Sequence, residues 1–94
     1  MPVPYSAPRS ALIYVIRINS DDPTEHQTPD AASKLVADNI YAGKSAKVTF
    51  QNAANLDTIR QNFNIRLDGH LRKLGHNTGF GYLPDTIGAE YRLK

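Results

Sequence analysis

Side chains that could bind a metal or attack a substrate are few in this sequence, and their spacing is unfavourable. The chain contains three histidines, His26, His70 and His76, and no cysteine. His70 and His76 are six residues apart, which does not place two imidazoles on one face of a helix, and no H-x-x-x-H pair occurs. The absence of cysteine also excludes a disulfide scaffold and a thiolate metal site. We therefore predict no metal site and no cofactor.

Other patterns that indicate catalysis are missing as well. No G-x-S-x-G motif is present. Asp21 and Asp22 form a carboxylate pair, but they lie in a polar stretch where turn formation is the expected role. The segment Gly79-Phe80-Gly81 is too short for a phosphate-binding loop, and no helix is expected after it. The sequence therefore predicts a protein that is not an enzyme.

Positive charge is concentrated between residues 60 and 76. Asp68 is the only carboxylate in this span, which holds four cations: Arg60, Arg66, Arg72 and Lys73. The formal net charge of the whole chain is only +2. Long cationic side chains on the solvent face of a helix neutralise phosphates and give salt-dependent binding. This pattern favours a nucleic-acid contact, and the alternative is a solvated helix face that keeps the protein soluble.

Aromatic side chains recur close to the end of the sequence. Phe80 and Tyr82 share one face of an expected strand, and Tyr91 lies on the expected partner strand, next to Arg92. Lys94 adds a further cation. Bases would stack on these rings if they lie on a sheet face opposite the helices. If the rings face the helices, they belong to the core, and the sequence leaves both arrangements open.

A second type of surface is suggested by Ile65, which lies opposite the apolar stripe of its expected helix. Gly69 follows one turn later, and an exposed isoleucine beside a small residue suits a neighbouring helix. A single surface isoleucine is also common in proteins that bind nothing there. Tyr5 and Arg9, in a proline-bearing segment, are further candidates for contact with a protein partner.

The hydropathy pattern predicts the elements that must position these side chains. Residues 11–18 are apolar on both faces, which is typical of a central strand, and residues 19–29 have the composition of a loop. A helix is expected over 29–42, with Thr28 as its N-cap and Gly43 as its C-terminal left-handed residue. Residues 45–50 alternate as a half-buried strand does.

A second helix has the clearest periodic signal in the chain. It is expected to begin after Asn52 or Asn55 and to end at Gly75, and Gly69 either leaves it continuous or splits it. Its apolar stripe consists of Leu56, Ile59, Phe63, Leu67, Leu71 and Leu74. Residues 80–83 and 89–94 are expected to form a hairpin around a turn at 84–88.

The order β-α-β-α-β-β predicts an α+β domain in which two helices pack on one face of a four-stranded mixed sheet with a C-terminal hairpin. Residues 1–10 are expected to form a flexible arm and residues 11–94 a single domain. No apolar run is long enough to span a membrane, and Met1 to Pro4 do not resemble a leader, so a cytoplasmic location is expected.

The function that these patterns favour is a non-enzymatic module that binds DNA or RNA through the basic second helix and the hairpin. The alternative is a small inhibitor or adaptor that acts by protein–protein contact, as accessory and anti-defence proteins of phages and other mobile elements do. The partners expected in that case are a protein target or a second copy of the chain.

Overall fold

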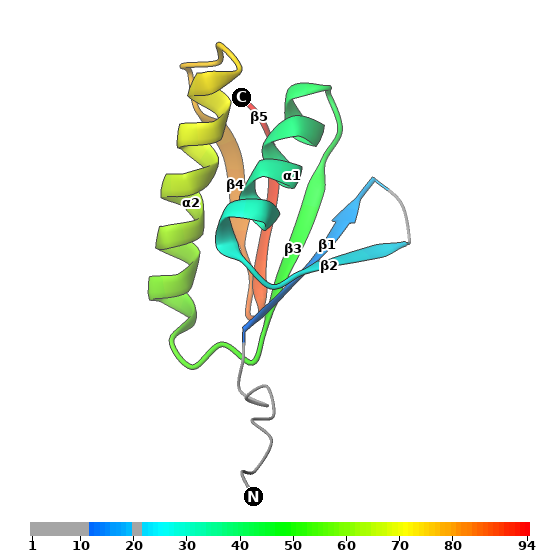
Figure 1. The fold of residues 1–94 in the computed structure, drawn as a ribbon, viewed down its shortest axis with the longest axis vertical. Helices are drawn as coiled ribbons and strands as arrows, with labels where there is room; N and C mark the ends of the chain where they lie inside the picture. Colours follow the sequence, from blue (N-terminus) through cyan, green and yellow to red (C-terminus); the bar gives the residue numbers. More distant parts are fainter. Residues whose placement is uncertain (1–11, 20–21) are drawn as a thin grey trace, which may run out of the picture.

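The computed structural model describes residues 12–19 and 22–94. The expected arm at 1–10, with Tyr5 and Arg9, lies outside the described residues. The described chain forms a sheet with two helices on one of its faces (Figure 1). In chain order the elements are β1 (Ile13–Ile18), β2 (Pro23–His26), α1 (Pro29–Tyr41), β3 (Ala46–Gln51), α2 (Leu56–Lys73), β4 (Phe80–Pro84) and β5 (Gly88–Leu93).

The sheet has five strands in the order β2-β1-β3-β5-β4, and every neighbouring pair is antiparallel. The α+β class is therefore confirmed, while the prediction of a four-stranded mixed sheet is wrong. The difference arises from β2, which returns the chain alongside β1 before α1 begins. As a result β3 enters the sheet from the opposite end and runs antiparallel to β1.

The extra strand β2 lies in the segment that the sequence pattern indicated to be a loop. Its four residues, Pro-Thr-Glu-His, are exposed except for the half-buried His26, so no apolar alternation marks it. It is held by backbone pairing to β1 at the edge of the sheet, from Tyr14 opposite His26 to Arg17 opposite Pro23. Backbone pairing of this kind leaves little trace in the sequence.

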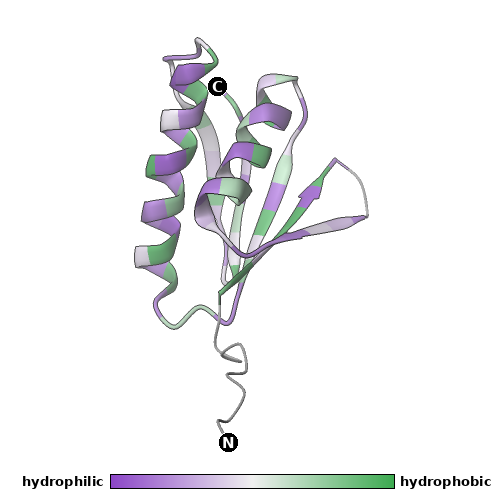
Figure 2. Ribbon diagram, viewed as in Figure 1, coloured by the Kyte–Doolittle hydropathy of each residue, from purple (hydrophilic) through white to green (hydrophobic). Residues whose placement is uncertain are grey.

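The core lies between the helices and the sheet face that they cover. Alternate residues of each central strand point into it, as with Ile16 of β1 and Val48 of β3, both fully buried. Four aromatic rings meet at its centre, and the centroids of neighbouring rings are 5.4–5.6 Å apart: Tyr14, Phe50, Phe63 and Tyr91. Figure 2 shows hydrophobic and hydrophilic residues alternating along both helices, as expected of helices with one buried face.

The predicted helix ends are confirmed. Thr28 Oγ1 accepts a hydrogen bond from the N–H of Ala31 at 3.2 Å, and Gly43 has a φ of 92°. Asn55, rather than Asn52, caps α2 by accepting from the N–H of Thr58. The helix α2 is continuous through Gly69, so the basic residues that follow stay on the same helix.

Candidate nucleic-acid interface

Arg60 does not contribute to a binding surface, because its side chain is only 10% exposed. Its Nε donates to the carbonyl of Gly88 at 3.1 Å and its Nη2 to the carbonyl of Asp85 at 2.7 Å. Its Nη1 lies 3.1 Å from the carboxylate of Asp57. The prediction that Arg60 contacts phosphate is therefore wrong, because the N–H groups of its guanidinium already hold the β4–β5 turn against α2. Its place in sequence, four residues after Leu56, could have indicated burial.

The next two cations of α2 are exposed, but each has a carboxylate partner. Arg66 Nη1 lies 3.7 Å from Asp30 Oδ1, and Arg72 Nε lies 2.8 Å from Asp68 Oδ2. Exposed pairs of this kind are weak and are screened by salt, so both arginines could still meet a phosphate. Each would first have to give up part of its interaction with the carboxylate.

The aromatic residues of the hairpin lie on the sheet face that the helices cover. Tyr91 is fully buried and donates a hydrogen bond to Asn64 Oδ1, and Phe80 and Tyr82 are partly buried against the same core. Burial raises the pKa of the Tyr91 phenol well above its ordinary value, and the nearby Tyr82 adds to this rise while Arg60 opposes it. The rings therefore do not form an open surface on which bases could stack. Of the two arrangements that the sequence left open, the structure shows the one in which the rings belong to the core.

The cations without a carboxylate partner gather at one end of the molecule. The structure describes ten of the eleven lysines and arginines, since Arg9 lies outside it. Four form ion pairs, and Arg17 has an interaction of its own. No carboxylate of a described residue lies within salt-bridge distance of the remaining five, which are Lys44, Lys47, Lys73, Arg92 and Lys94.

These five residues, here called the basic end, come from four separate segments. Both helices and β5 finish, and β3 starts, at the same end of the sheet (Figure 1). All five residues are exposed. Glu90, the residue in register with Lys47, is a carboxylate on the same sheet face. The sequence pattern indicated Lys73, Arg92 and Lys94 but missed Lys44 and Lys47, because only the strand order brings them near the others.

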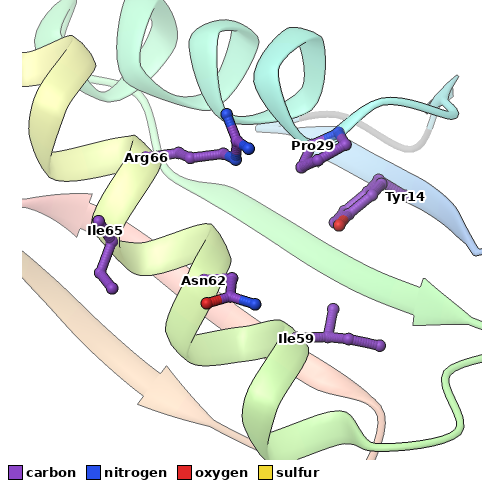
Figure 3. A pocket seen from close by; sticks show the side chains of 6 residues that line it. All are labelled: Tyr14, Pro29, Ile59, Asn62, Ile65 and Arg66. Atoms are coloured by element: carbon purple, nitrogen blue, oxygen red, sulfur yellow. The ribbon is translucent and has the colours of Figure 1, made fainter.

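A hollow of about 420 Å³ lies between the start of α1 and the first half of α2. Tyr14 and Ile59 form part of its lining, together with Pro29, Asn62, Ile65 and Arg66 (Figure 3). Ile65 is 71% exposed, as its place on the helix indicated. Gly69 lies one turn further along and is only partly exposed. Burial raises the pKa of the Tyr14 phenol, with Arg66 acting in the opposite direction, so this hydroxyl is neutral at physiological pH.

Two of the three histidines make contacts that link elements of the fold, while the buried Nε2 of His26 has no hydrogen-bond partner among the described residues. His70 Nε2 lies 3.1 Å from Asp30 Oδ1, which links α2 to the start of α1, and His76 Nε2 lies 2.6 Å from the carbonyl of Gly79. Within residues 12–19 and 22–94, no group of three or more histidine, aspartate or glutamate side chains could hold a metal ion. Within the same residues, no helix is both long and apolar enough to cross a membrane.

No family model matches the chain, and neither a curated protein nor a solved structure is detectably similar to it.

Proposed function

We propose that the protein is a non-enzymatic nucleic-acid-binding module whose contact surface is the basic end. The observation that supports this proposal is that five described cations have no carboxylate of a described residue within salt-bridge distance, and all five lie at this end. Each of the other five described cations has an interaction. A phosphate approaching the basic end meets ammonium and guanidinium groups that form no ion pair with a described carboxylate, although Glu90 lies in register with Lys47. Each such contact releases condensed counterions from the nucleic acid, which is the main source of non-specific affinity.

The surface differs from the one that the sequence pattern favoured. Lys73, Arg92 and Lys94 remain in it, and Lys44 and Lys47 are added. The buried residues are removed, and so are Arg66 and Arg72, which are paired with carboxylates. Because the hairpin aromatics face the core, the proposed contacts are to phosphates and not to stacked bases. We therefore expect binding with little preference for base sequence.

A charge-matched pair of double variants tests this proposal. Lys44→Gln/Lys94→Gln removes two positive charges from the basic end, and Lys34→Gln/Arg66→Gln removes two from the paired cations elsewhere. Both change the formal net charge from +2 to zero. We expect the first variant to weaken binding of a labelled oligonucleotide by about tenfold or more at low salt. Its log-affinity against log-salt slope should fall in magnitude by about 1.5, as expected for two lost phosphate contacts.

The control variant is expected to bind within about twofold of the wild type, because its two cations already neutralise carboxylates. Circular dichroism should show both variants folded, since all four side chains are at least partly exposed. Equal loss of affinity in the two variants would mean that only net charge matters. That result would contradict a localised interface.

The hollow beside Ile65 favours a second candidate function, contact with a protein partner. A side chain that is 71% exposed at the rim of a partly apolar hollow suits insertion of a partner's side chain. The variant Ile65→Asp separates the two functions, because it should abolish a protein complex and leave oligonucleotide affinity nearly unchanged.

A further inference from the structure

The two edge strands of the sheet differ in how well they are protected against pairing with another strand. The edge strand β2 is four residues long and carries a proline and Glu25. The edge strand β4 is five residues long, Phe-Gly-Tyr-Leu-Pro, and carries no charge. Its Leu83 is 66% exposed. Proteins usually protect an edge with charged side chains, and β4 has only its terminal proline.

The hydrogen-bond phase of β4 shows which of its backbone groups face outward. The N–H of Asp85 donates to the carbonyl of Gly88 at 3.0 Å, so these residues form a bonded pair of the β4–β5 hairpin. Bonded and non-bonded pairs alternate along an antiparallel ladder. The residues whose backbone groups point away from β5 are therefore Phe80, Tyr82 and Pro84.

We propose that β4 pairs with β4 of a second copy of this chain, antiparallel and about a two-fold axis at Tyr82, to form one ten-stranded sheet. In this register the Tyr82 N–H of each copy donates to the Tyr82 carbonyl of the other. The N–H of Phe80 donates to the carbonyl of the partner's Pro84, and the symmetric bond forms as well. Each copy's Pro84, which has no N–H, falls at one end of the ladder, so one bond is lost at each end, where the loss is tolerated.

Side chains on the open sheet face make this pairing self-complementary. The register places Leu83 of one copy opposite Gly81 of the other. Gly81 leaves a hollow of about 120 Å³, lined also by Tyr82, Leu83, Glu90 and Arg92. The side chain of Arg92 crosses Gly81, since a Cβ at that position would lie 2.8 Å from Arg92 Cγ and 3.1 Å from its Nε. The exposed leucine of each copy therefore lies against Gly81 and the methylene groups of Arg92 in the other, and both contacts form at once.

The variant Leu83→Lys tests the pairing, with Ile65→Lys as its matched control. Leu83 and Ile65 are the two most exposed large apolar side chains described, so neither change should disturb the fold. Sedimentation equilibrium should show the wild type moving from 10.4 kDa toward twice that mass as its concentration rises. We expect Leu83→Lys to weaken association by about tenfold or more, because it places a charge at the edge. Ile65→Lys should associate like the wild type.

A disulfide test fixes the register independently, because the chain has no cysteine of its own. Bonded partners in an antiparallel pair have Cα atoms about 5.5 Å apart, within the range that a disulfide bridges. Tyr82→Cys should therefore form a covalent dimer on mild oxidation, and Ile65→Cys should not. A wild type that stays monomeric at every concentration overturns the proposal. A dimer that Ile65→Lys disrupts, or that only Ile65→Cys cross-links, also overturns it by placing the contact on α2.

Discussion

Gly88→Ala is expected to destabilise the fold severely. A Cβ at this position would overlap the carbonyl oxygen of Val48 and would lie 2.8 Å from its carbonyl carbon and 3.0 Å from Thr49 Cα. These atoms belong to the backbone of β3, the middle strand of the sheet, which cannot move aside without breaking its pairing on both sides. We expect a loss of more than about 4 kcal/mol in the free energy of unfolding, a large share of what a small domain has.

Urea denaturation followed by circular dichroism measures this loss, and Gly69→Ala is the matched control. Gly69 lies inside α2, and nothing is within 4 Å of the position that its Cβ would occupy. The added methyl restricts the unfolded chain and favours the helix, so we expect a gain of about 0.5–1 kcal/mol. If Gly88→Ala had the midpoint of the wild type, the close approach of β5 to β3 described here would be wrong.

Arg60→Met is expected to lower the free energy of unfolding by about 2–4 kcal/mol. Methionine can replace the buried stem of the side chain, but the carbonyls of Gly88 and Asp85 lose their charged donor. The ion pair with Asp57 contributes little to this loss, because that carboxylate is 86% exposed and regains water. Arg60→Lys should recover only part of the stability, since a single ammonium does not reproduce the fork of a guanidinium.

Unfolding in urea measures the stability of Arg60→Met, and binding of an oligonucleotide to the folded variant provides the second readout. Because the guanidinium is buried away from the basic end, the affinity of the folded variant should equal that of the wild type. A variant with unchanged stability and lost affinity would show that Arg60 contacts the nucleic acid.

Much of the fold could be predicted from local signals. The N-caps Thr28 and Asn55 and the apolar stripe of α2 are chemical features of contiguous residues, and the structure confirms the caps and the stripe from Leu56 to Leu71. Leu74, the last residue of the predicted stripe, lies just past the helix and is 37% exposed. The strand β2 could not be predicted in the same way, because its pairing with β1 uses backbone groups that every residue has. Missing that one strand also gave the wrong direction for β3 relative to β1.

The candidate site was harder to predict than the fold. Charge density along the sequence pointed to α2, but Arg60 is buried and Arg66 and Arg72 are paired with carboxylates. The basic end is formed by segments that are distant in the sequence and end at the same side of the fold. Lys44 and Arg92, for example, line the same hollow only because the strand order places β3 next to β5. The aromatic pattern of β4 and β5 was compatible with either sheet face, and only the position of the helices decides between them.

The salt dependence of nucleic-acid affinity tests the central proposal most directly. Fluorescence anisotropy of the wild-type protein with labelled single- and double-stranded DNA and RNA should be measured between about 50 and 200 mM salt. If the five cations of the basic end each meet a phosphate, the log–log slope should be about −3.5 for a single strand and about −4.5 for a duplex. Absence of binding to all four probes at the lowest salt, or a slope near zero, would contradict the proposed function.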